Sequence, residues 1–327
     1  MDSLKIMRVC RKNTGRLRFL LLAAIVLFSG CSRGLKTRRF LYFGTFIDIS
    51  LPVRADEKIF GLLEDEIKRC DNLLNVKNGV TAELNKKSFI KNAELAALIK
   101  RVKYAHSETG GLFDPTVEPV LKVTGFSPVS EKFGRAAPPE IMKKALSEVG
   151  FDKIKTKNDI ITLNGALLNF GGCGKGYLLE KLAKTLLDNG INNALINAGG
   201  DILAIGKHLK KPWRIGVRSP GKKSFTYIIA VTDEAVATSG DYENFFIDSG
   251  KKYSHIVNPS TGQSSEKRQV TVICKEPLAA DIYATVFMLM ATDKALHKAD
   301  ALGMGVMIYA PGEEIASNKI FRDYLIR

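Results

Sequence analysis

The chain has 327 residues, 45% of them hydrophobic and 25% charged, and its formal net charge is +15 at pH 7. This is ordinary globular composition, and the length suits one large domain or two small ones. The positive charge suits a protein that works near anionic lipid or an anionic ligand. No stripe of Arg and Lys interleaved with aromatic residues accompanies it, so nucleic acid is not an expected partner.

The first thirty residues predict a signal peptide. Basic residues up to Arg18 precede the apolar run Phe19 to Phe28, which is too short to span a bilayer, because a span needs roughly 20 residues. Small residues then lead directly into a cysteine, in Ser29-Gly30-Cys31. This order resembles a bacterial lipobox, although Phe28 stands where Leu is usual, and it predicts that Cys31 is lipidated. The alternative is an ordinary leader in which Cys31 has no role.

Residues 31–39 are expected to form a basic tether between the lipid and the folded domain. Lys36, Arg38 and Arg39 fall in this stretch, where they would lie against lipid headgroups. The folded domain is then expected to cover residues 40–327.

From residue 40 the apolar periodicity predicts one domain of the α+β class, in which strands and helices are mixed. Strands are expected at 40–51, in a hairpin over 152–168 that turns at 157–159, and at 213–217, 225–231, 244–247, 253–257, 270–274 and 304–309. Helices are expected at 55–74, from a cap at Asn92 to about 109, and at 138–149, 178–187, 278–290 and 294–301. The polar stretch 75–87 and the stretch 112–121, which holds two prolines, are expected to be irregular.

The stretch from Asn169 to Tyr177 holds four glycines within six residues, together with Lys175. It lies between an apolar run and a leucine-rich helix, so it predicts a turn at a helix N-terminus, where backbone N–H groups favour an anion such as phosphate. The spacing fits neither the dinucleotide fingerprint nor the P-loop. A second glycine turn, Asn197 to Asp201, follows the helix, and together the two turns suggest a single cradle. A glycine cluster alone would equally suit a turn that is tight for packing reasons.

Three further stretches hold candidate chemistry. Ala237 to Tyr242 brings hydroxyls, a glycine and a carboxylate to a predicted turn, and His255 lies on a predicted strand before a Pro/Gly turn. Asp281 and Thr285 are four residues apart on one face of a helix, and their oxygens can supply two ligands to a hard cation such as Mg²⁺. Taken singly, a structural histidine and a helix-capping aspartate would explain the same residues.

In order along residues 40–310, these stretches resemble the FAD:protein FMN transferases of the ApbE family. The matching motifs are Gly44-Thr45, Gly110 to Val117, Gly171 to Tyr177, Asn197 to Asp201, Ala237 to Tyr242, His255 to Pro259, and Ala280-Asp281 with Thr285. The resemblance implies a single mixed domain with FAD in a cleft. It also implies a lipid-anchored protein of the inner membrane that faces the periplasm or the cell exterior.

The resemblance further implies a reaction. The FMN half of FAD would be transferred to a Thr or Ser hydroxyl of a partner flavoprotein, the acceptor subunit of a membrane redox complex, and AMP would leave. By position, Mg²⁺ would be held by the Gly172 carbonyl, Asp281 and Thr285, and His255 would be the base. The FAD site would be lined by Phe43, Leu112, Phe113, Asp114, Asn169, Lys175 and Ile256.

Elementary chemistry agrees with this assignment. Phosphoryl transfer needs charge neutralisation and in-line positioning more than a protein nucleophile, and a lysine at a helix N-terminus adds positive charge. A neutral imidazole, with an ordinary pKa of about 6.5, could accept the proton of the incoming hydroxyl.

The sequence departs from the family at Asn169 and Asn258, where Asp is usual, and the polar loop after the first helix lacks the usual aromatic residue. Two alternatives stay open: an FAD pyrophosphatase that uses the same metal and cleft, and a lipid-anchored flavin-binding protein without turnover. Mg²⁺-dependent AMP release would separate the second alternative from the other two functions, and covalent flavin on a partner would separate transferase from pyrophosphatase.

Overall fold

A computed structural model of the protein describes residues 34–131, 134–218, 220, 225–242, 244–312 and 314–326. The predicted signal peptide and Cys31 lie outside these residues. The domain described below is the unit that starts at Gly34.

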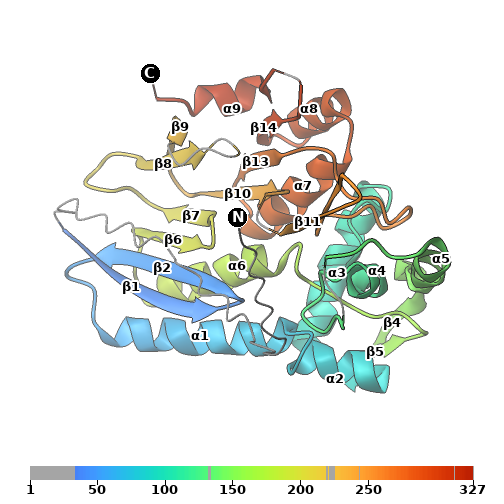
Figure 1. The fold of residues 1–327 in the computed structure, drawn as a ribbon. Helices are drawn as coiled ribbons and strands as arrows, with labels where there is room; N and C mark the ends of the chain where they lie inside the picture. Colours follow the sequence, from blue (N-terminus) through green and yellow to red (C-terminus); the bar gives the residue numbers. More distant parts are fainter. Residues whose placement is uncertain are drawn as a thin grey trace, which may run out of the picture. The chain divides into compact units, whose positions relative to one another are not determined.

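An eight-stranded sheet with the strand order β1-β2-β6-β7-β10-β13-β14-β15 forms the centre of this domain (Figure 1). All neighbouring strands are antiparallel. The strands are β1 Leu35–Tyr42, β2 Thr45–Pro52, β6 Ala194–Ala198, β7 Asp201–Ile205, β10 Glu234–Gly240, β13 Gln269–Cys274, β14 Gly305–Tyr309 and β15 Ala316–Ser317. In β2, every second side chain from Ile47 to Leu51 is fully buried, as expected for a strand with one face on a core.

Helices cover one face of the sheet, and the largest core cluster lies between the two. The covering helices are α1 Lys58–Leu74, α6 Gly174–Asp188, α7 Pro277–Leu289 and α8 Thr292–Ala301, and α3 Ala93–Glu108 contributes to the same core cluster. A second core cluster lies on the other face, where it is covered by the hairpin of β8 Trp213–Arg218 and β9 Phe225–Val231 and by α9 Lys319–Asp323. None of the helices described in residues 34–326 is long and apolar enough to cross a membrane.

Smaller elements lie outside the eight-stranded sheet. A three-stranded sheet has the order β3-β5-β4, and a separate hairpin pairs β11 with β12. The strands are β3 Phe89–Lys91, β4 Ile154–Lys157, β5 Ile160–Leu163, β11 Phe245–Asp248 and β12 Lys251–Ser254. The remaining helices are α2 Val80–Lys87, α4 Glu118–Val123, α5 Pro139–Glu148 and the single turns η1 Pro115–Val117 and η2 Phe151–Lys153.

The predicted single mixed α+β domain is confirmed, and so are most of its elements. The side chain of Asn92 caps α3 by accepting a hydrogen bond from Leu95 N at 2.8 Å. The β4–β5 hairpin turns at Asn158 and Asp159, which both have positive φ.

The prediction of a basic tether over residues 31–39 is wrong from Leu35 onward, because β1 begins there and pairs with the end of β2. The basic side chains of this stretch have partners within the domain. Lys36 and Arg38 contact Glu57 at 2.6 and 2.8 Å, and Arg39 contacts Asp48 on the adjacent strand at 2.6 Å. Cross-strand and nearby carboxylates therefore allow a basic segment to join the sheet.

Three other predicted boundaries are corrected. The strand expected over 40–51 is a hairpin that turns at Phe43 and Gly44, with φ of 54° and 66°, the left-handed values that tight hairpins require. The stretch 75–87 contains α2. The two prolines of 112–121 stand in the first turns of η1 and α4 rather than breaking them, since the first turn needs no N–H from proline.

Replacing Gly176 by Ala should lower the free energy of unfolding by about 1–3 kcal/mol, because the new Cβ would lie 2.4 Å from the Pro277 carbonyl oxygen and 2.8 Å from Asp281 Cβ. Gly61→Ala is the matched control, since no heavy atom lies within 4 Å of that Cβ in α1. Gly61→Ala should raise the free energy of unfolding by about 0.5–1 kcal/mol. Urea unfolding followed by circular dichroism measures both. A Gly176→Ala protein as stable as wild type would contradict the tight contact between α6 and α7.

Candidate active site

The glycine-rich stretch forms a turn that leads into α6, as predicted. The helix begins at Gly174, so Lys175 lies in its first turn. Asn169 shapes the turn: its Oδ1 accepts a hydrogen bond from Gly171 N at 2.7 Å, and its backbone N–H donates to the Pro115 carbonyl at 2.7 Å. The positive end of the helix dipole favours an anion here, while Gly174 N already donates to the Phe170 carbonyl at 2.7 Å.

Three of the predicted site residues enclose the turn. A Cβ on Gly172 would lie 3.2 Å from Phe113 Cε2 and 3.5 Å from Thr285 Oγ1, and one on Gly174 would lie 3.6 Å from Phe43 Cε1. Two aromatic rings and a hydroxyl therefore come against the backbone of the glycine turn. A side chain at Gly172 would press on the Phe113 ring, whereas a Cβ at Gly174 would make ordinary van der Waals contact.

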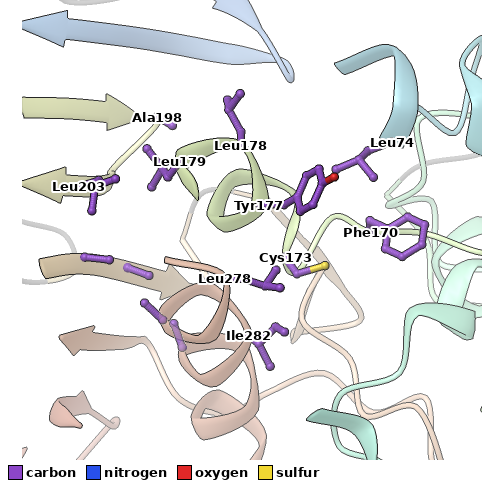
Figure 2. Packing of buried hydrophobic residues seen from close by; sticks show 14 of the residues in the cluster. Leu74, Phe170, Cys173, Tyr177, Leu178, Leu179, Ala198, Leu203, Leu278 and Ile282 are labelled. Carbon is purple, nitrogen blue, oxygen red and sulfur yellow. The ribbon is translucent and has the colours of Figure 1, made fainter. Parts of the chain in front are cut away.

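Apolar packing holds the turn in place from the opposite side. Cys173 lies toward Leu278 and Ile282 of α7, while Tyr177 points toward Leu74 at the end of α1 (Figure 2). All five side chains belong to the main core cluster. Burial raises the pKa of the Cys173 thiol well above its usual range, so this cysteine is a core residue and not a nucleophile.

The second glycine turn joins the first through an ion pair. Asp201 begins β7 and is buried, and its Oδ2 lies 2.8 Å from Lys175 Nζ. Its other oxygen accepts a hydrogen bond from Thr238 N at 3.0 Å. A Cβ on Gly199 would lie 2.4 Å from Thr45 Oγ1, so this turn also packs on the β1–β2 turn. The two glycine turns thus lie together, and their joint role as a ligand cradle stays a prediction.

Asp281 places a second buried carboxylate beside this pair. It lies in the first part of α7, and its Oδ2 accepts a hydrogen bond from Gly176 N at 2.8 Å. Burial raises the pKa of Asp281, and the charge of Asp201 acts in the same direction, while Lys175 opposes both. Two buried carboxylates share one lysine, so a further cation would be favourable here.

The oxygens that could hold such a cation lie around the start of α6. They are the carboxylate of Asp281, the hydroxyl of Thr285 one helical turn further on, and the carbonyl of Gly172, whose residue lies against Thr285. Thr285 Oγ1 also lies 3.4 Å from Ser239 Oγ on β10. Oxygen-only donors fit Mg²⁺, which binds few protein groups and completes its shell with water and phosphate. No cluster of three His, Cys, Asp or Glu side chains suited to a metal occurs within the described ranges.

His255 follows β12 rather than lying within it, and it is half-buried. Its Nδ1 lies 3.2 Å from the Asn244 carbonyl oxygen. Since a carbonyl only accepts, Nδ1 carries the proton in this contact, and Nε2 keeps a lone pair. Burial lowers the pKa of His255, the charge of Lys175 lowers it further, and the Asn244 carbonyl and Asp241 oppose them. The imidazole is therefore neutral at neutral pH and suited to accept a proton.

The other predicted FAD-contacting residues are more buried than expected for ligand contacts. Asp114 Oδ1 accepts hydrogen bonds from Thr116 N at 2.8 Å and from Thr116 Oγ1 at 2.6 Å, and its Oδ2 lies 3.5 Å from His106 Nδ1. Its carboxylate thus supports the loop that carries Phe113. Leu112 is half-buried against the core, and Ile256 is buried. Their role in FAD binding stays a prediction.

Asn169 faces a carboxylate that the sequence analysis did not single out. Its Nδ2 donates to Glu118 Oε2 at 2.7 Å, and Ser127 Oγ donates to Glu118 Oε1 at 2.6 Å. Glu118 is 1% exposed, and burial raises its pKa while both hydrogen bonds oppose the shift. An aspartate at position 169 would meet this carboxylate directly, so Asn suits the site of this chain.

Asn258, the second departure, has a local role. Its Oδ1 accepts hydrogen bonds from Ser260 N at 2.9 Å and from Thr261 N at 3.3 Å, which close the turn after Pro259. An aspartate could accept the same bonds.

Sequence reasoning missed three contributors to this site: Asp201, Ser239 and Glu118. Asp201 and Ser239 fall inside motifs that were recognised, but no role followed from their neighbours. Glu118 had one usable signal, an acidic residue among the apolar residues 115–121. That it faces Asn169 depends on two segments 51 positions apart in the chain.

Comparison with known proteins agrees with this geometry. A sequence profile of the ApbE family matches residues 43–308. The FAD:protein FMN transferase of Haemophilus influenzae is 30% identical over 230 residues, which are 66% of either chain, and that of Treponema pallidum is 27% identical over 74% of this chain and 72% of its own. The crystal structure of an ApbE protein from Thermotoga maritima superposes with a TM-score of 0.84 at 28% identity, covering 90% of this chain and all of the other.

The fold and the relatives place this chain in the flavin transferase class of proteins. The chain belongs to the ApbE family, whose profile spans most of the described domain.

Asn169→Asp should destabilise the domain by about 1–3 kcal/mol at pH 8, because two carboxylates would then meet where Asn169 Nδ2 and Glu118 Oε2 are now 2.7 Å apart. One of the two carboxylates, the new one at position 169 or that of Glu118, must keep its proton in the folded state, so the pKa of this pair is higher in the folded protein than in the unfolded chain. The folded state then binds more protons than the unfolded one, and stability falls as pH rises from about 4 through the raised pKa. Melting temperatures relative to wild type at pH 5 and pH 8 measure this.

The double variant Asn169→Asp with Glu118→Gln is the control, since it restores one carboxylate and one amide. It should recover most of the stability at pH 8. An Asn169→Asp deficit that is equal at both pH values would contradict the repulsion between the two carboxylates.

Proposed function

We propose that the protein transfers the FMN half of FAD to a Thr or Ser hydroxyl of a partner flavoprotein and releases AMP, in a reaction that requires Mg²⁺. The observation that carries the proposal is the convergence of Lys175, Asp281 and Thr285 on the glycine turn at the start of α6. The family membership and the names of the relatives support it.

The start of α6 would hold the pyrophosphate of FAD. The positive end of its dipole favours the phosphate charge, and Lys175 adds a positive charge that Asp201 keeps in position at 2.8 Å. When bound by Asp281, Thr285 and the Gly172 carbonyl, Mg²⁺ supplies further stabilisation of the charge that develops on the phosphates. Phe43 and Phe113 line the turn with apolar surface that excludes water.

His255 would activate the incoming hydroxyl. Its Nε2 takes the proton of the acceptor Thr or Ser while a bond forms between the hydroxyl oxygen and the phosphorus of FMN. The bond from that phosphorus to the bridging oxygen of the pyrophosphate breaks, and AMP leaves with this oxygen. The Asn244 carbonyl holds the opposite ring nitrogen at 3.2 Å, which keeps the ring in the tautomer that can accept the proton.

The two alternatives use the same residues. In an FAD pyrophosphatase, water replaces the acceptor hydroxyl at His255. In a flavin-binding protein without turnover, FAD binds and no AMP appears. Incubation of the purified full chain with FAD, Mg²⁺ and a candidate acceptor tests all three. Covalent flavin fluorescence on the acceptor after denaturing electrophoresis supports the transferase, AMP with free FMN alone supports the pyrophosphatase, and absence of AMP supports the binding protein.

We also propose that the protein is anchored by a lipid on Cys31 and faces the periplasm or cell exterior. The leader up to Phe28 and the small residues before Cys31 support this proposal. The acceptor would then be a flavoprotein subunit of a redox complex in the same membrane.

Asp281→Ala should reduce AMP release at least 10²-fold, because a metal-binding carboxylate and the hydrogen bond to Gly176 N are both lost. FAD binding, measured by flavin fluorescence, should weaken less, since the glycine turn remains. Asp188→Ala removes an exposed carboxylate at the other end of α6 and should leave the rate unchanged. Full activity of Asp281→Ala would remove this residue from the metal site.

His255→Ala should slow flavin transfer by roughly 10² to 10⁴, the usual effect of losing a general base, while FAD still binds. Because burial lowers the pKa of His255, the wild-type rate should stay constant near neutral pH and fall only as the pH drops through that lowered pKa, where the imidazole becomes protonated. The variant should lack this fall. His297, exposed on α8, provides the matched control His297→Ala. A variant at position 255 with wild-type rates across pH 6 to 8 would exclude the role of base.

A further inference from the structure

A basic groove lies at the end of the domain where the described chain begins. It is formed by the start of β1, the end of β2 and the connection from β7 to β8. Its lining residues include Gly34, Val53, Arg54, Lys207, Leu209 and Lys210. Neither the proposed reaction nor the family's motifs use these residues.

The groove carries positive charge that is not neutralised. Arg54, Lys207 and Lys210 are exposed, and no acidic residue lines the groove. Within the part of the chain that the structure describes, none of these three side chains forms an ion pair, in contrast to Lys36, Arg38 and Arg39 on β1. Such a surface attracts an anionic partner.

Large apolar side chains stand beside these cations. Leu209 is 65% exposed and Val53 is 58% exposed. Leu209 and the adjacent Lys210 both have positive φ, 48° and 67°, a conformation that costs free energy in residues other than glycine. The turn that carries them is held by paired backbone hydrogen bonds of 2.9 Å between His208 and Lys211, and the His208 ring stacks on Trp213 at 5.2 Å. A rigid turn therefore displays a leucine and a lysine to the exterior.

The place of the groove in the chain indicates its occupant. Gly34, the first described residue, lines it and follows the proposed lipid attachment site, Cys31, by only three positions. Three residues extend to roughly 10 Å at most. A lipid on Cys31 would therefore bring this end of the domain to the bilayer surface.

The catalytic residues lie at the other end of the β1–β2 hairpin. The register pairs Leu35 with Pro52 beside the groove and Tyr42 with Thr45 at the far end. The turn there, at Phe43, packs on Gly174 of the candidate active site. Eight residues of strand span roughly 25 Å, and Figure 1 shows β1 and β2 running side by side along this length.

We propose that this groove is a membrane-docking surface for anionic phospholipid headgroups. Arg54, Lys207 and Lys210 contact the headgroup phosphates, and Leu209 and Val53 enter the interface. Docking by this surface would hold the active site roughly 25 Å above the bilayer. The inference goes beyond the proposed reaction and rests on the proposed anchor only for bringing the chain to a membrane.

Hydrogen–deuterium exchange on the full chain tests the surface. The protein is incorporated into phosphatidylcholine vesicles with or without phosphatidylglycerol, and amide exchange is compared between the two. Residues 53–55 and 206–211 should exchange more slowly on the anionic vesicles. Lys207→Glu with Lys210→Glu should abolish this protection, since each cation contributes roughly fivefold to binding at an anionic surface. Protection should also decline as salt is raised.

The β4–β5 hairpin supplies the matched control. It displays Lys155 and Lys157 beside Ile160, which is 44% exposed, so Lys155→Glu with Lys157→Glu removes the same charge from another surface with an exposed apolar residue. This variant should keep the protection of 206–211. Protection of the hairpin instead of the groove, or equal exchange on both kinds of vesicle, would overturn the proposal. Mass spectrometry of the peptide that contains Cys31 tests the lipid anchor separately. The rate of flavin transfer in detergent tests the proposed reaction separately.

Discussion

The close contact between α6 and α7 is the constraint on which the candidate active site depends. Gly176 lies against the backbone of Pro277 and Leu278, and its N–H donates to Asp281 Oδ2 at 2.8 Å. A side chain at this position would push the helices apart. The same contact brings the start of α6, with the positive end of its dipole, beside the carboxylate and the hydroxyl that α7 carries. One glycine thereby brings the candidate phosphate site and the candidate cation site next to each other.

Buried charge is balanced around this contact in two places, and in different ways. Near the helix ends, Asp201 and Asp281 share Lys175, which leaves a need for more positive charge that a bound cation would meet. On the far side of the turn, Glu118 is satisfied by neutral donors from Asn169 and Ser127. The excess negative charge of Asp201 and Asp281 favours the binding of a cation. The carboxylate of Glu118 accepts a hydrogen bond on each oxygen, so it stabilises the turn and does not require a ligand.

The β1–β2 hairpin connects the candidate active site with the basic groove. Its turn places Phe43 against Gly174, and its open end borders the basic groove. Its basic residues are neutralised by Glu57 and Asp48, whereas those of the groove are not. The distribution of ion pairs, more than the net charge of the chain, therefore distinguishes a surface that belongs to the fold from one that is open to a partner.

The sequence by itself determined the fold class, most element positions and the family, because apolar periodicity and glycine at close contacts are local properties of the chain. The glycine turn, the cap at Asn92 and the pair Asp281 and Thr285 could all be predicted from neighbouring residues.

Other features were decided only by tertiary structure. The basic segment after residue 34 became a strand because carboxylates from β2 and the start of α1 pair with it. Asp201 contacts Lys175, and Glu118 contacts Asn169, because the sheet and the loop at 115–118 bring distant segments of the chain together. Such long-range pairs depend on tertiary packing, which a short segment of the sequence does not contain. The Asp201–Lys175 pair determines the charge of the candidate site, and the Glu118–Asn169 pair explains why asparagine suits position 169.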